Sequence, residues 1–230
     1  MPPTSPPTKI GVVLFPGFQP LDLFGPLDAF HILSRLYPLH LSILSSTLDP
    51  VPTRNWAQAS TGSQFSASIV PTHTFATAPG DLDVLLIPGG LGATGPEGEG
   101  NVQACVEWLR ELTLDGGKDG GIQWVLTVCT GSDILARAGK LEGRTATTNK
   151  RVFNDVKARH PNVNWVAKAR WVVDGNIWTS SGISAGMDLA FAWIAEVWGE
   201  EAAQLAADTS EYERNTDAGD DRYTERWGAV

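Results

Sequence analysis

Short apolar runs alternate with segments of helical spacing along most of the chain, a pattern typical of alternating strands and helices. Apolar runs of strand length lie at residues 8–15, 39–45, 83–87 and 122–128. Apolar positions at helical spacing lie at residues 21–33, 101–114 and 182–198. The run that ends at Ile87 is unbroken, as expected for a strand that helices cover on both faces. The alternation predicts an α/β fold, with a mostly parallel sheet and helices on both of its faces.

Other segments depart from this alternation. Residues 51–70 are rich in Thr and Ser and predict a β-hairpin or an excursion from the sheet. Residues 163–179 alternate between apolar and polar positions, which predicts a second hairpin. We expect residues 1–7 to be a disordered, Pro-rich lead, residues 8–208 to form a single domain, and residues 209–230 to form a polar C-terminal arm.

Charge and cysteine content exclude several classes of function. The chain has 17 Lys and Arg against 26 Asp and Glu, a formal net charge of −9. We therefore expect no nucleic-acid or anionic-membrane partner, because binding these needs clustered basic residues. No apolar run approaches the ~18 residues of a membrane span, and the Pro-rich first residues lead us to expect no signal peptide. Two cysteines, Cys105 and Cys129, are too few for a disulfide-built fold, so a reduced, cytoplasmic protein is expected.

Cys129 is the strongest candidate for chemistry. It follows a buried strand directly, and the small residues Gly131 and Ser132 then open a helix. Such a turn lifts a side chain to the carboxyl edge of the sheet, where open α/β folds place their sites. The helix N-terminus should also lower the pKa of the thiol. The alternative is a buried structural cysteine, which is our interpretation of Cys105, on the apolar stripe of residues 101–114.

Two further segments end strands at the same edge of the predicted sheet. Gly89 and Gly90 follow the strand at 83–87, where their N–H groups could face an oxyanion; a simple tight turn is the alternative. Asp22 lies in an apolar setting at a helix start, where burial should raise its pKa. Its alternative role is that of a helix N-cap or first-turn acid.

No metal or cofactor is predicted. No two ligand-type side chains stand at metal-binding spacing near Cys129. Residues 90–95 match the dinucleotide pattern G-x-G-x-x-G, but the Gly- and Pro-containing residues 96–100 are unsuited to the helix that must hold a pyrophosphate. The expected partner is a small-molecule substrate.

Together, these segments resemble the ThiJ/PfpI superfamily, which has a class I glutamine amidotransferase-like, flavodoxin-like fold of three layers. Residues 19–26, 127–132 and 182–188 are most similar to its isonitrile hydratase branch. The resemblance implies that Cys129 is a nucleophile with a strained backbone and that Asp22 is its acid partner. It also implies that Gly89, Gly90 and Thr130 line the oxyanion and substrate pocket, and that the protein forms a homodimer.

The chain departs from many relatives in lacking an imidazole near the nucleophile. Protease-like members place His directly after the nucleophile, where this chain has Thr130. Others have Thr-Thr-His after the next strand, where this chain has Thr147, Thr148 and Asn149. A Cys–His hydrolase would therefore lack its general base.

Three functions remain as hypotheses from the sequence. The first is a cofactor-independent lyase that hydrates isonitriles to N-formamides, with Cys129 as nucleophile and Asp22 as acid and base. The second is a glyoxalase- or deglycase-like carbonyl lyase or hydrolase. The third is a non-enzymatic redox sensor in which Cys129 is oxidised.

Overall fold

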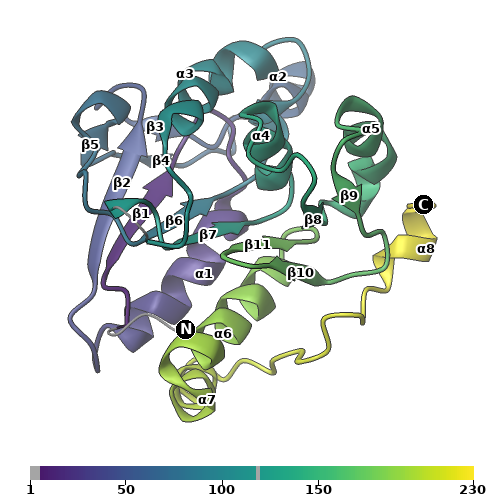
Figure 1. The fold of residues 1–230 in the computed structure, drawn as a ribbon. Coiled ribbons are helices and arrows are strands. Elements are labelled where there is room, and N and C mark those ends of the chain that lie inside the picture. The colour runs from purple at the N-terminus through teal and green to yellow at the C-terminus, as the bar shows by residue number, and fades with distance from the viewer. Residues whose placement is uncertain (1–5, 118–119) are drawn as a thin grey trace.

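The computed structural model describes residues 6–117 and 120–230, and a twisted sheet forms its centre (Figure 1). Within these residues the sheet has seven strands in the order β10-β11-β7-β6-β1-β2-β5. Their bounds are β1 (Lys9–Val13), β2 (His40–Ser45), β5 (His73–Thr74), β6 (Val84–Ile87), β7 (Trp124–Thr127), β10 (Trp171–Asp174) and β11 (Ile177–Ser180). All neighbours pair in parallel except β10 and β11, which form an antiparallel hairpin.

Helices cover both faces of this sheet, so the predicted three-layer α/β fold is confirmed (Figure 1). One face carries α1 (Pro20–Leu33), α6 (Ala185–Trp198) and α7 (Glu200–Thr209), which contact one another. The other carries α3 (Gly98–Glu111) and α4 (Gly131–Arg137). No helix in the described ranges is long and apolar enough to cross a membrane.

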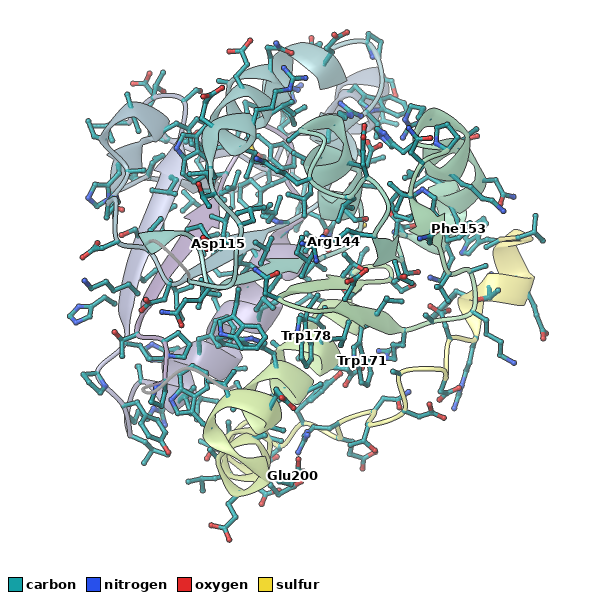
Figure 2. The ribbon with its side chains drawn as sticks, viewed as in Figure 1. Asp115, Arg144, Phe153, Trp171, Trp178 and Glu200 are labelled. Carbon is teal, nitrogen blue, oxygen red and sulfur yellow. The ribbon has the colours of Figure 1, made fainter. Side chains whose placement is uncertain are left out.

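The core is continuous across the layers because the central strands are buried on both faces. Every residue of β6 is buried. On the α1–α6 side the fully buried Trp193 meets Phe30 and Trp124 edge to face, with ring centroids 5.5 and 6.1 Å apart. Trp178 of β11 lies on the same side as α6 (Figure 2) and packs edge to face on Trp124. These tryptophans join a strand, a hairpin and two helices.

Two excursions leave the main sheet. β3 (Val51–Pro52) pairs antiparallel with β4 (Ser68–Ile69), and α2 (Trp56–Thr61) lies between them, so 51–70 is an excursion with its own small sheet. The short strand β8 (Thr145–Ala146) pairs in parallel with β9 (Asn164–Trp165). The hairpin predicted over 163–179 is therefore confirmed only for β10 and β11. Its first residues pair elsewhere, because Val166 N–H donates to Ala146 and Arg170 N–H to Ala218.

Three short 3₁₀ turns and two more helices complete the described elements. They are η1 (Phe75–Thr77), η2 (Leu91–Ala93), η4 (Lys150–Val152), α5 (Phe153–Arg159) and α8 (Tyr223–Trp227).

The two ends of the chain differ in how far they pack. Of the lead predicted at 1–7, residues 1–5 lie outside the described residues, and Pro7 is buried. The C-terminal arm, residues 209–230, runs from α7 past the β10–β11 hairpin toward α5 (Figure 1), and α8 packs against the segment just before α5, residues 150–152. It is held by side chains of its own chain, such as Asp188, which accepts from Asn215 N–H at 2.9 Å.

Candidate active site

Cys129 lies on the sharp turn between β7 and α4. Its φ is 58°, a left-handed conformation that costs a non-glycine residue about 1–3 kcal/mol. The strained backbone that the resemblance implied is thus present. Two features restrain this turn. Cys129 N–H donates to Ser181 O at 3.1 Å, and Gly131 packs so closely on Ile87 that an added Cβ would lie 2.1 Å from Ile87 O. The turn is therefore held against the ends of β6 and β11.

The Cys129 sulfur lies among hydrogen-bond donors, although the residue is only 5% exposed. Asn149 Nδ2 donates to Sγ at 3.0 Å. The backbone N–H groups of Thr130 and Ile183 are also near the sulfur and lower the pKa of the thiol. Ile183 precedes α6 and has φ of 41°, which is rare for a β-branched residue. A sulfur surrounded by N–H donors is suited to carrying negative charge during a reaction.

Asp22 is fully buried in the first turn of α1. Gly89 N–H donates to its Oδ2 at 3.0 Å, its buried Oδ1 has no hydrogen-bond partner in the described structure, and the Cys129 thiol is near enough to affect the pKa of the carboxyl. The carboxyl does not cap the helix, whose N-cap is Gln19. Burial raises the pKa of Asp22 to about 7, as the sequence predicts. Asp22 can therefore both give and take a proton near neutral pH.

The turn at Gly89 and Gly90 joins the acid to the cysteine turn. A Cβ on Gly89 would lie 2.5 Å from both Thr130 N and Thr130 Oγ1, and 3.0 Å from Asp22 Oδ2. Gly90 N–H donates to Thr130 Oγ1 at 3.0 Å. Both glycine N–H groups thus already have protein acceptors, and the turn fixes the two functional groups relative to each other. An oxyanion role for these N–H groups stays a prediction.

The lowered thiol pKa expected at Cys129 is wrong for this structure. Burial raises the pKa of the thiol, and the negative charge of Asp22 raises it further. The donors around the sulfur oppose this rise without cancelling it, and α4 is only seven residues long. This rise in pKa favours the protonated thiol at neutral pH.

Two site contacts come from residues to which the sequence assigns no role. Thr148 Oγ1 donates to Cys129 O at 3.1 Å, beside the Asn149 contact to the sulfur. Both lie in the segment between β8 and η4. The departure from the Thr-Thr-His pattern marks this segment in the sequence, but it indicates only a missing imidazole and not an amide in its place.

The histidines serve elsewhere in the described structure. His160 Nε2 lies 2.9 Å from Asp133 Oδ1, and Asp133 also pairs with Arg137 and Arg159. His31 and His40 are exposed, and His73 is half-buried. Across residues 6–117 and 120–230, no group of three or more His, Cys, Asp or Glu side chains could hold a metal ion. The site thus offers a thiol, a carboxyl of near-neutral pKa and several N–H donors.

Comparison with known proteins places these features in context. The family model described as the DJ-1/PfpI family matches residues 8–196. Isonitrile hydratase of Pseudomonas putida is 37% identical over 89% of this chain and 78% of its own length. A deglycase of Pyrococcus horikoshii is 29% identical over 76% of this chain and 95% of its own. The crystal structure of a ThiJ/PfpI family protein from Pseudomonas syringae has a TM-score of 0.70 and 29% identity, covering 93% of this chain and 78% of that one.

Proposed function

This chain belongs to the DJ-1/PfpI family, and we propose that it hydrates isonitriles to N-formamides with Cys129 as nucleophile and Asp22 as acid and base. The observation that carries the proposal is the pairing of a buried thiol with a carboxyl whose pKa is raised to about 7. An isonitrile suits this pair because its terminal carbon accepts both a nucleophile and a proton, and no amine has to leave. The similarity to isonitrile hydratase supports the same reaction.

In the first step Asp22 takes the thiol proton, and the Cys129 sulfur attacks the isonitrile carbon. Asp22 then delivers that proton to the same carbon. The S–H bond is broken, C–S and C–H bonds are formed, and the product is a thioimidate, R–N=CH–S–Cys129. One positioned proton carrier of this kind contributes roughly 10²–10⁴-fold to the rate.

In the second step Asp22, again ionised, takes a proton from water as the water oxygen attacks the thioimidate carbon. The nitrogen gains a proton and the C–S bond breaks, which leaves R–NH–CHO and the Cys129 sulfur. The remaining proton returns to the sulfur through Asp22, so one water is consumed and the enzyme is restored. Asn149 and the N–H groups of Thr130 and Ile183 stabilise the sulfur as it leaves.

The substrate class follows from the residues beside the reacting groups. Leu21 and Phe24 flank Asp22 on α1 and are 39% and 44% exposed, and Ile183 is 36% exposed. Ile183, whose backbone is near the sulfur, exposes an apolar side chain beside the thiol, which favours an isonitrile with an apolar substituent. We therefore propose alkyl or aryl isonitriles as substrates.

The test compares Asp22→Asn, Cys129→Ala and a control, Asp28→Asn, on cyclohexyl isonitrile. Asp28 is an exposed acid on the same helix. Formamide production should fall roughly 10²–10⁴-fold in Asp22→Asn, vanish in Cys129→Ala and stay unchanged in Asp28→Asn. Undiminished turnover in either site variant would refute the assigned roles.

A carbonyl lyase or hydrolase is the second candidate, favoured by the similarity to a deglycase. Asn149 counts against it, because an amide cannot serve as a general base. Lactate formation from methylglyoxal, with no formamide from isonitriles, would favour this alternative. The redox-sensor alternative is weakened by the raised pKa of the buried Cys129 thiol, since oxidation proceeds through an exposed thiolate.

The homodimer implied by the resemblance remains a prediction. Sedimentation equilibrium tests it: a mass twice that of the chain supports it, and a mass equal to that of the chain contradicts it.

A further inference from the structure

A buried ion pair joins the C-terminal arm to the segment that contacts the nucleophile. Lys150 Nζ lies 3.7 Å from Asp221 Oδ2, and both side chains are 1% exposed. Lys150 begins η4, and Asp221 belongs to the arm just before α8. The mechanism above uses neither residue, and a buried ion pair is not by itself stabilising. The pair therefore calls for an explanation from its surroundings.

The Lys150 ammonium stabilises the conformation of residues 147–150 (the brace) by hydrogen bonds within this segment. It donates to Thr147 Oγ1 at 2.5 Å and to Thr148 O at 3.2 Å, which closes a tight loop over residues 147–150. The charged group that faces it is Asp221, from the arm. From α5 it meets the ring of Phe153, whose centroid is 5.4 Å from Nζ. Phe153 lies on the side of the molecule where the arm ends (Figure 2).

The braced loop carries two of the contacts to Cys129. Thr148 Oγ1 holds the Cys129 carbonyl, and Asn149 Nδ2 donates to the sulfur. Asn149 Oδ1 is used at the same time, since it accepts from Arg151 N–H at 2.9 Å. The position of the amide on the sulfur thus depends on the conformation of a loop that Lys150 closes and Asp221 neutralises.

We propose that Lys150 and Asp221 are positioning residues for the nucleophile, through which the C-terminal arm keeps the Asn149 amide on the Cys129 sulfur. The inference rests on the proposed function only in taking Cys129 as the nucleophile. It assigns the arm a role in the site, although the arm supplies no group that touches the sulfur.

The protonation of Lys150 supports this role. Burial lowers its pKa to about 8, and Asp221 opposes that fall. Without the Asp221 charge the pKa of Lys150 falls further, so the amine loses its charge at a lower pH than in the native protein and its bonds to Thr147 and Thr148 weaken. The brace should therefore weaken above about pH 8 in the native protein, and at lower pH in Asp221→Asn.

The direction in which Asp221→Asn changes the pKa of the Cys129 thiol distinguishes a positioning role from a direct charge effect. Removing a negative charge would by itself lower the pKa of the Cys129 thiol. Loss of the Asn149 donor would raise that pKa instead, because a hydrogen bond to the thiolate is lost. We measure the rate of Cys129 alkylation by iodoacetamide from pH 6 to 10, with peptide mass spectrometry to distinguish Cys105.

Positioning predicts that Asp221→Asn slows alkylation about two- to tenfold from pH 6 to 8, the effect of one hydrogen bond, because it raises further a thiol pKa that burial has already raised. Asn149→Ala should give a similar loss, and adding Asp221→Asn to Asn149→Ala should cause little further change. The control is Glu225→Gln, an exposed acid of the same arm, which should match the native protein.

Unchanged or faster alkylation in Asp221→Asn, or full additivity with Asn149→Ala, would overturn the proposal. If Asp221→Asn does not fold, the double variant Lys150→Met with Asp221→Asn removes both charges together, a change that buried ion pairs tolerate. It should show the same slow alkylation. Alkylation needs no isonitrile, so the two hypotheses are tested separately. If the protein makes no formamide but its variants follow this alkylation pattern, the proposed function is refuted and the positioning role of Lys150 and Asp221 is supported.

Discussion

Gly89→Ala tests whether the turn after β6 holds the acid and the nucleophile together. The added Cβ would lie 2.5 Å from Thr130 N and Oγ1, whereas ordinary contacts begin near 3.4 Å. The turn and the cysteine turn must then separate by about 0.9 Å. Displacements of about 1 Å in a catalytic arrangement cost on the order of 10²-fold in rate. We expect a loss of that order in formamide production.

The same overpacking should destabilise the fold by about 1–3 kcal/mol, because the atoms that the Cβ meets include the backbone. For a chain of this size each kcal/mol lowers Tm by about 2–4 °C. The control is Gly80→Ala, since a Cβ at Gly80 meets nothing within 4 Å. That variant should keep native turnover and native Tm.

Thermal unfolding followed by circular dichroism and a formamide assay by chromatography measure the two effects separately. A Gly89→Ala protein with native turnover would refute the view that this turn sets the distance between carboxyl and thiol. Native turnover together with a lowered Tm would limit the role of the glycine to packing.

Two further predictions concern the buried titratable groups. Burial raises the pKa of Asp22 from 3.8 to about 7, so its contribution to stability is present below about pH 4 and is lost as the pH rises through 7. In urea unfolding, the free energy of unfolding of Asp22→Asn should therefore rise relative to that of the native protein between pH 4 and 8, by up to about 4 kcal/mol. A difference in free energy of unfolding that does not change with pH would contradict this. Iodoacetamide at pH 8 should label Cys129 faster than Cys105, because Asn149 donates to the Cys129 sulfur, Asp22 is near enough to take its proton, and Cys129 is 5% exposed against 1% for Cys105. Equal labelling by mass spectrometry would contradict the special setting of Cys129.

The order of strands and helices could be predicted from the sequence because its signals are local. The unbroken run ending at Ile87 and the glycines that follow it define a buried strand and its end without reference to the rest of the chain. The turn at Cys129 is equally local, since a strand, one nucleophilic residue and small helix-opening residues are consecutive. These elements agree with the structure to within a few residues.

The contacts that set the properties of the site are not local, and the sequence did not predict them. Asn149 reaches the sulfur from 20 residues away, and Asp221 supports the same loop from the end of the chain. The sign of the thiol pKa shift also depends on distant groups. A helix N-terminus is visible in the sequence and favours a lower pKa, but the burial and the Asp22 charge that outweigh it exist only in the folded protein.

The groups that can give and take protons in this site explain why an addition reaction suits it better than a hydrolysis. Near neutral pH the raised pKa of the Cys129 thiol favours its protonated form, and Asp22, whose pKa is about 7, can take up that proton, share it with the sulfur and release it. Hydrolysis of an amide needs a second acid to protonate the departing amine, a task that imidazole performs in Cys–His enzymes. Asn149 stands beside the sulfur and donates a hydrogen bond, but it cannot release a proton. Isonitrile hydration needs only the shared proton and those of the incoming water, which matches what the site can supply.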